Sequence, residues 1–191
     1  MNILVVSATK EELKTLNNIE VLITGVGIPN TIFKLTNHLN NYKYDLIINI
    51  GICGSFKNTY DIGNVVEIIR DEFSEIGYED GDLFFSLDKK FGINTIFNVP
   101  SSTNLPKVHA ITVNTVHGSI SSIERVVNQL NPDVESMEGA ACFMVCQYFD
   151  TPCIQIRAVS NKVEERDISK WNIPLAVNNL NVALEKIIKG L

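Results

Sequence analysis

The sequence is poor in cysteine and has no long apolar run. Its four cysteines in 191 residues are too sparse for a disulfide-stapled scaffold, and most lie in apolar stretches where a thiol acts as a small hydrophobe. No run approaches the roughly 20 apolar residues that span a bilayer, and the amino terminus lacks the basic and apolar segments of a signal peptide. We therefore expect a cytoplasmic protein with no membrane partner.

An excess of positive charge is also missing. Sixteen Lys and Arg residues against 22 Asp and Glu residues give a net charge of −6, which repels phosphate backbones. This balance excludes nucleic acid as the expected partner. With 45% hydrophobic residues the chain can bury a core, and its length predicts a single domain over residues 1–191.

Short apolar runs alternate with helical patterns along the chain. Strands are expected at residues 2–7, 21–24, 46–50, 64–69, 108–116, 134–137 and 153–160. Helices are expected after residue 8, around residues 32–39, over 121–130 with Ser121 and Ser122 as the cap, over 138–149 and over 173–188. Residues 71–82 and 162–170 are expected to be loops, and 86–107 give no clear element. This alternation predicts an α/β fold with a largely parallel sheet covered on both faces.

Three polar residues follow predicted strands, at the edge where ligands bind in open α/β sheets. Glu12 comes in the first turn after the first strand, Glu138 follows the strand at 134–137, and Asn161 follows the strand at 153–160. Each also has a purely structural explanation. A carboxylate in the first turn of a helix complements the helix dipole, and asparagine is a common turn residue. Position alone leaves both explanations open.

Glycine pairs, cysteines and histidines are weaker signals. Gly25-x-Gly27 and Gly51-x-x-Gly54 follow apolar strands and allow either a close approach to a ligand or a tight turn. Cys142 and Cys146 are four residues apart with no further ligands around them, so we assign them to core packing and expect no metal. Among the histidines, only His117 comes where a ligand could reach it.

Five motifs together resemble the purine nucleoside phosphorylase and nucleosidase superfamily over most of the chain. They are Ala8-Thr9-x-x-Glu12, Thr24-Gly25-Val26-Gly27, Gly51-Ile52-Cys53-Gly54, Ser136-Met137-Glu138-Gly139 and Arg157-Ala158-Val159-Ser160-Asn161. The resemblance implies a three-layer αβα nucleoside phosphorylase-like fold with a mixed, largely parallel sheet. It implies that Glu138 binds the ribose hydroxyls, that Met137 packs on the sugar and that Glu12 orders the attacking water. Backbone groups of Cys53 and Gly54 would lie beside the base.

Within this superfamily the chain most resembles the futalosine hydrolase branch. The resemblance rests on Ala8-Thr9-x-x-Glu12, on Val113-Asn114-Thr115-Val116 with Gly118-Ser119, and on Val159-Ser160-Asn161 continuing to Trp171. It adds Ser136, Val116 and His117 to the expected substrate contacts. Methylthioadenosine nucleosidases have a glutamate in place of Ser136 and an aspartate in place of Asn161. Hexameric phosphorylases hold phosphate with an Arg and a Ser, where this chain has Asn49 and Ile52.

The resemblance implies hydrolysis of the N-glycosidic bond of futalosine, a step of menaquinone biosynthesis, with water as nucleophile and no cofactor. Glu12 would be the general base, Glu138 would stabilise the cationic ribosyl transition state, and Asn161 would bind N7 and O6 of hypoxanthine. A methylthioadenosine/S-adenosylhomocysteine-type or broader purine nucleosidase, a phosphorylase, and a non-catalytic nucleoside-binding module stay open as alternatives. The resemblance also implies a homo-oligomer, dimer or tetramer, whose neighbour helps to close the pocket.

Overall fold

A computed structural model describes the chain from residue 1 to 191 except residues 15, 17, 82 and 88–90. The strands are β1 (Ile3–Ser7), β2 (Glu20–Ile23), β3 (Leu46–Ser55), β4 (Val65–Phe73), β5 (Gly77–Asp80), β6 (Leu83–Ser86), β7 (Ile96–Asn98), β8 (Lys107–Thr112), β9 (Val134–Ser136) and β10 (Cys153–Lys162). The helices are α1 (Ile28–Leu39), α3 (Ile120–Leu130), α4 (Gly139–Tyr148) and α5 (Ile173–Gly190), with 3₁₀ turns η1 (Lys10–Glu12) and η2 (Ile168–Lys170).

The main sheet is mixed and largely parallel, as predicted. Its strand order is β10-β4-β8-β9-β3-β1-β2, with β7 paired to β4. Because β10 also pairs with β3, the path through β3, β10, β4, β8 and β9 closes on itself. Strand β3 pairs in parallel with β1 and β10 and antiparallel with β9. The carboxyl ends of β1, β3 and β10 therefore meet at one edge of the sheet.

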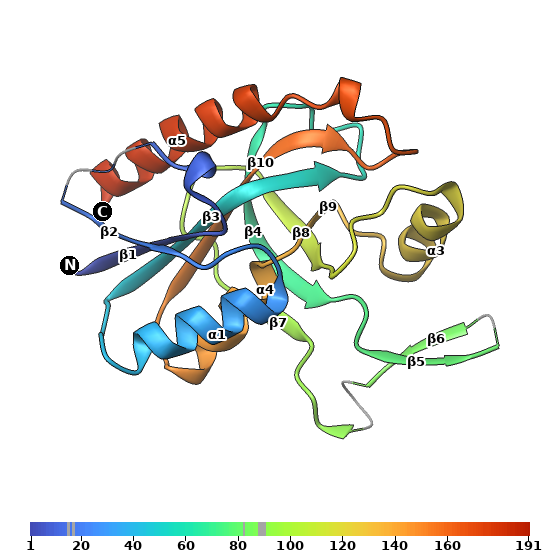
Figure 1. Ribbon diagram of the computed structural model, residues 1–191, viewed down its shortest axis with the longest axis horizontal. Coiled ribbons are helices and arrows are strands. Elements are labelled where there is room, and N and C mark those ends of the chain that lie inside the picture. Colours follow the sequence, from blue (N-terminus) through green and yellow to red (C-terminus); the bar gives the residue numbers. More distant parts are fainter. Residues whose placement is uncertain (15, 17, 82, 88–90) are drawn as a thin grey trace.

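Helices cover both faces of this sheet (Figure 1). Helix α5 lies on one face and buries Ala176, Leu180 and Leu184 against apolar residues of β3 and β10. Helices α1 and α4 pack against each other on the other face. Helix α4 is apolar on nearly every side, and seven of its ten residues are buried, which makes it the central packed helix that the sequence predicts. The three-layer arrangement is confirmed.

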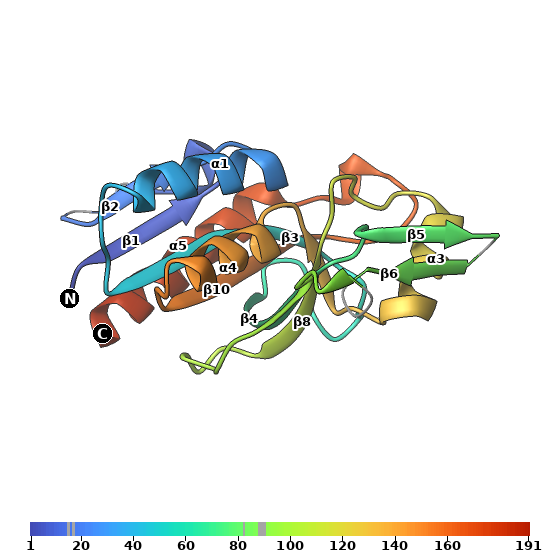
Figure 2. The same cartoon turned by 90° about the horizontal axis from the view of Figure 1, so that it is seen from below.

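A smaller part projects from the carboxyl edge. Strands β5 and β6 form an antiparallel hairpin beside α3, away from the main sheet (Figure 2). Helix α3 packs Val126 against Ile111 and Val113 of the β8 segment. Its side-chain cap is Ser119, whose hydroxyl accepts from the amide of Ser122, so the predicted cap at Ser121 and Ser122 is wrong by two residues.

Several predicted boundaries are also wrong. The helix expected after β1 is only the short turn η1; residues 15 and 17 of that segment lie outside the described part of the chain. The loop expected at 71–82 contains the end of β4 and the strand β5, apart from residue 82, which is not described. Strand β7 lies in the segment 86–107, for which the sequence gives no clear element; residues 88–90 of it are not described.

Two strands run further than predicted, and both extensions matter for the site. Strand β3 continues through Gly51–Gly54 instead of ending at Ile50. Strand β10 continues to Lys162, so Asn161 lies within it, beside a register shift against β3 between Val159 and Asn161. An irregularity of this kind re-aims side chains at a sheet edge. Ser160 is the residue left without a partner at this irregularity, and Asn161 pairs with Gly54 directly after it, so Asn161 is a strand residue and not a turn residue.

Candidate active site

Glu12 is a buried carboxylate held at the carboxyl ends of two strands. Its Oε2 accepts hydrogen bonds from the Ser7 hydroxyl at 2.8 Å and from the Thr9 amide at 3.1 Å. Its Oε1 accepts from the Ile52 amide at 3.2 Å. Ser7 ends β1 and Ile52 lies in β3, so the carboxylate bridges neighbouring parallel strands. Three donors fix its orientation.

Glu138 is the N-cap residue of α4, near enough to Glu12 for their charges to interact. Its Oε1 accepts from the amide of Gly27 at 2.9 Å. Gly27 has a φ of 92°, a backbone conformation open to glycine, so the second glycine of Gly25-x-Gly27 presents its amide to the carboxylate. Burial raises the pKa of Glu138, the positive charge of Arg157 opposes this, and the negative charge of Glu12 adds to it. The negative charge of Glu12 therefore disfavours the ionised form of Glu138.

Arg157 is a functional candidate that the residue-by-residue sequence reasoning missed. It is 1% exposed in the middle of β10. Its Nη atoms donate to the side-chain and backbone oxygens of Asn49 and to the carbonyl of Ile156, while Nε has no hydrogen-bond partner among the described residues. The sequence does indicate it, because Arg157 is a charged residue in an otherwise apolar strand. Arginine is almost never fully buried unless it is paired.

Gly51 shows how close Glu12 and Arg157 come. A Cβ atom built on Gly51 would lie 3.1 Å from Glu12 Oε1 and 3.7 Å from Arg157 Nε. Both polar groups therefore face the same side of β3 at a position where the chain has no side chain. The predicted glycine loop is a strand, and the carboxylate and the guanidinium both border the space that a side chain at Gly51 would fill.

Cys53, Gly54 and Asn161 form a second group, two to three residues beyond Gly51 along β3 and beside it in β10. A Cβ atom on Gly54 would lie 3.1 Å from Asn161 Nδ2 and 3.6 Å from Glu135 Cγ, so these side chains converge there. Asn161 Nδ2 donates to the Lys162 carbonyl at 2.9 Å, and its Oδ1 accepts from the Ser160 hydroxyl at 2.8 Å. Burial raises the pKa of the Cys53 thiol to about 12, so this side chain is a neutral thiol packed in the apolar core and not a nucleophile.

His117 is held by Glu135, a buried residue that the sequence analysis did not single out. The imidazole Nδ1 lies 2.5 Å from Glu135 Oε2, and the His117 amide donates to Oε1 at 3.0 Å. Glu135 lies in β9, paired with Gly54 of β3. The His117 segment is thereby tied to the group around Gly54, while its neighbour Val116 is 36% exposed.

Met137 and Ser136 lie between the two groups. Met137 packs on the apolar cluster formed by Ile111, Val113 and Val126. Ser136 is buried, its carbonyl accepts from the amide of Val113, and its hydroxyl has no partner among the described residues. The structure thus brings Glu12, Glu138 and Arg157 into one group, and Cys53, Gly54, Asn161, Glu135 and His117 into another, joined by residues 51–54 of β3.

A model of the phosphorylase superfamily matches residues 5–189. The chain therefore belongs to the phosphorylase superfamily. It is 26% identical over 160 residues to futalosine hydrolase of Streptomyces coelicolor, covering 78% of this chain and 67% of that one. It is 30% identical over 189 residues to 5′-methylthioadenosine/S-adenosylhomocysteine nucleosidase of Bacillus velezensis, covering 88% and 81%.

Solved structures share the fold over the whole chain. A Helicobacter pylori methylthioadenosine nucleosidase mutant with 5′-methylthioadenosine in its active site superposes with a TM-score of 0.85, 16% identity and coverage of 100% and 99%. Futalosine hydrolase of Helicobacter pylori superposes with a TM-score of 0.76, 15% identity and coverage of 99% and 97%. Within its superfamily the chain is an enzyme of the nucleosidase class, which hydrolyses N-glycosidic bonds. None of the described helices is long and apolar enough to cross a membrane.

Proposed function

We propose that this chain hydrolyses the N-glycosidic bond of futalosine, releasing hypoxanthine and dehypoxanthine futalosine in menaquinone biosynthesis. The observation that carries the hydrolytic part is the placement of Glu12 beside the unpartnered Nε of Arg157 over Gly51. Three donors orient the Glu12 carboxylate, and the buried guanidinium supplies an N–H near the same point over Gly51. This pair can bind a water molecule and take its proton.

The reaction needs three things: an activated water, stabilisation of a cationic ribosyl group, and help for the departing base. Glu12 accepts the proton of the water as general base, and Arg157 Nε donates to the water oxygen. Glu138 accepts hydrogen bonds from the 2′ and 3′ hydroxyls of the ribose, and these contacts strengthen as the ring becomes positive. Met137 packs on the apolar side of the sugar.

The base is recognised by the group around Gly54. Hypoxanthine presents acceptors at N7 and O6 and a donor at N1. Because N7 and O6 are both acceptors, the atom of Asn161 that serves this edge is Nδ2, which has a second hydrogen beside the one that it donates to the Lys162 carbonyl. His117 turns its Nδ1 toward Glu135, so Nε2 is the ring nitrogen that is left to contact the base edge. A mismatched base would leave buried polar groups unpaired.

The main alternative is a methylthioadenosine/S-adenosylhomocysteine nucleosidase. It is favoured by the 30% identity to the Bacillus velezensis enzyme and by the TM-score of 0.85 to the Helicobacter pylori enzyme. Ser136 and Asn161 disfavour it, because methylthioadenosine nucleosidases have a glutamate at the first of these positions and an aspartate at the second. A phosphorylase is disfavoured because Asn49 is occupied in holding Arg157. A non-catalytic binding module would not need a buried, oriented Glu12.

A base-release assay tests the proposal. Futalosine, inosine and methylthioadenosine are each incubated with the enzyme, with and without phosphate, and free base is quantified by chromatography. We expect hypoxanthine from futalosine in phosphate-free buffer at the highest kcat/KM of the three. Preferred release of adenine from methylthioadenosine would replace the proposed substrate. A ribose 1-phosphate-type product that appears only with phosphate would replace hydrolysis. Light scattering of the same sample tests the predicted homo-oligomer.

A further inference from the structure

Three cysteine sulfurs converge at the end of the molecule opposite the carboxylates. Cys142 and Cys146 lie on successive turns of α4, and Cys153 begins β10. The Cys142 Sγ lies 4.0 Å from the Sγ of Cys146 and 4.0 Å from that of Cys153. All three sulfurs lie within 4.8 Å of one another. The sequence pattern indicates only the helical pair; the fold supplies the third thiol.

This triangle has the size of a metal–thiolate site. A thiophilic ion bound about 2.3 Å from each of three sulfurs in a plane holds those sulfurs about 4 Å apart. The observed separations are close to that value before any ion is present. Thiolate ligands select soft ions, of which Cu(I) is the main biological monovalent example. Among the described residues, no histidine, aspartate or glutamate joins the three sulfurs, which favours three-coordinate Cu(I) over tetrahedral Zn(II).

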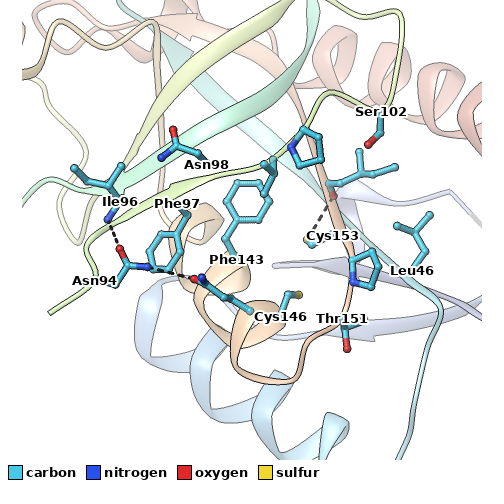
Figure 3. Close-up of a pocket in the computed structure, with 15 residues that line it drawn as sticks. Leu46, Asn94, Ile96, Phe97, Asn98, Ser102, Phe143, Cys146, Thr151 and Cys153 are labelled. Atoms are coloured by element: carbon cyan, nitrogen blue, oxygen red, sulfur yellow. Dashed lines mark hydrogen bonds between the residues drawn. The ribbon is translucent and has the colours of Figure 1, made fainter. Parts of the chain in front are cut away.

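A cavity gives access to the sulfurs. Cys146 and Cys153 line a space of about 450 Å³ whose walls include Phe97, Phe143 and Pro152 (Figure 3). Leu46 and Cys153, the first residues of β3 and β10, also line it. The cavity therefore lies at the amino ends of these strands, away from Glu12 and Glu138. Its lining mixes these apolar residues with polar ones such as Asn94 and Gln147, and it brings a small ion to the side of the cluster formed by Cys146 and Cys153.

We propose that Cys142, Cys146 and Cys153 bind one Cu(I) ion in a three-coordinate thiolate site. Metal–sulfur bonds replace the S–H bonds, the released protons pass to the solvent, and no electron is transferred. The site is independent of the nucleosidase reaction, so its failure and the failure of the proposed function are separate results.

The test is an anaerobic titration of the reduced, full-length protein with Cu(I) in competition with the chromophoric chelator bicinchoninate. We expect one equivalent of Cu(I) to be withheld from the chelator. Cys153→Ser, at the least buried of the three, should weaken binding by at least about 100-fold. Cys53→Ser is the matched control: it removes a buried thiol outside the cluster and should leave the stoichiometry at one. Circular dichroism and thermal melting establish that each variant is folded.

Two further readouts make the result decisive. One equivalent of Cu(I) should raise the melting temperature of the wild type and not that of Cys153→Ser, and X-ray absorption should report three sulfur neighbours. If Cys153→Ser does not fold, Cys146→Ser takes its place in the comparison. The proposal is overturned if no ion is withheld, if binding is lost in Cys53→Ser and retained in Cys153→Ser, or if Zn(II) displaces Cu(I) at equal concentration.

Discussion

The region around Glu12 and the region around Glu138 each hold a buried carboxylate, but they hold it in different ways. Glu12 accepts hydrogen bonds from a side chain and two backbone amides contributed by β1, η1 and β3. Glu138 is the N-cap residue of the apolar helix α4 and accepts a hydrogen bond from the amide of Gly27. A general base needs one fixed orientation, whereas a group that follows ribose hydroxyls through a reaction needs room to adjust. The two environments suit the roles that we propose for Glu12 and Glu138.

The residues that hold the backbone next to the two carboxylates also differ. Behind Glu12, the Asn181 amide of α5 donates to the Glu12 carbonyl at 3.0 Å and ties the turn to the outer helix layer. Behind Glu138, Gly139 packs so tightly on Asp71 and Gln155 that a methyl group there would overlap both. The first region thus depends on a neutral amide and the second on a buried acid. The following changes separate the two regions, from the largest expected effect to the smallest.

Glu12→Gln should have the largest effect. The amide keeps the size of the side chain but cannot accept the proton of the water, so kcat should fall by about 10² to 10⁴. Substrate binding should change little, because Glu12 does not contact the ribose in the proposed complex. Steady-state kinetics with a binding measurement on a non-cleavable analogue check this. Unchanged turnover would return Glu12 to a purely structural role at the end of η1.

Glu138→Gln should lower both binding and turnover. The neutral amide lacks the negative charge that stabilises the developing ribosyl cation. We therefore expect a fall in kcat of about 10² to 10³ with a rise in KM. The contrast with Glu12→Gln lies in KM. If both variants changed only kcat, the proposal that Glu138 binds the ribose while Glu12 does not would be wrong.

Asp71→Asn tests the buried acid behind Glu138 by its effect on stability. Burial raises the pKa of Asp71 from 3.8 to about 6 in the folded protein, despite hydrogen bonds from Gln155 and Thr112. The folded state then holds this proton more tightly than the unfolded state, so its contribution to stability is full below about pH 4 and is lost as pH rises through about 6. The difference of two pKa units corresponds to about 3 kcal/mol.

Urea unfolding between pH 4 and 7.5 measures this contribution. The wild-type free energy of unfolding should fall by about 2.5 kcal/mol relative to Asp71→Asn over this range. Asp61→Asn, at a side chain that is 81% exposed, is the control and should follow the wild type. Parallel curves for the wild type and Asp71→Asn would show that Asp71 does not titrate in this window.

The apolar strands could be predicted from the sequence, because continuous buried runs leave a strong pattern. The main errors arose where local pattern and tertiary packing disagree. Gly51 and Gly54 resemble loop residues, yet they stay in β3 because the missing side chains make room for Glu12, Arg157 and Asn161. The role of Glu135 was not predicted, since its pairing with His117 depends on a contact between residues 18 positions apart.

Asn161→Asp tests base recognition, a task that we assign neither to the region around Glu12 nor to the region around Glu138. An ionised aspartate only accepts hydrogen bonds and repels O6 of hypoxanthine, whereas a protonated one can serve N7 of adenine. The ratio of kcat/KM for futalosine over its 6-amino analogue should fall by about 5- to 150-fold, or about 1 to 3 kcal/mol. Equal losses on both substrates would mean that Asn161 shapes the end of β10 and does not contact the base. Asn64→Asp, at an exposed loop asparagine, is the control for the added charge.

Gly27→Ala should have the smallest effect on activity and tests how the Glu138 region is held. Gly27 and Gly25 have φ values of 92° and 88°, and a methyl group fits sterically at both positions. Alanine at either position should therefore cost a similar amount of stability, about 1 to 3 kcal/mol. The two glycines differ in their amides, because only that of Gly27 donates to Glu138.

The Gly25 amide donates instead to the carbonyl of Ala8, which makes Gly25→Ala the matched control. Relaxation of the strained backbone in Gly27→Ala turns its amide away from Glu138, and losing one such bond should raise KM by roughly 5- to 10-fold, or about 1 kcal/mol. Gly25→Ala should melt at a similarly reduced temperature with an unchanged KM. If both variants raised KM equally, the whole loop between β2 and α1 would position the ribose, and the single amide would not be what holds Glu138.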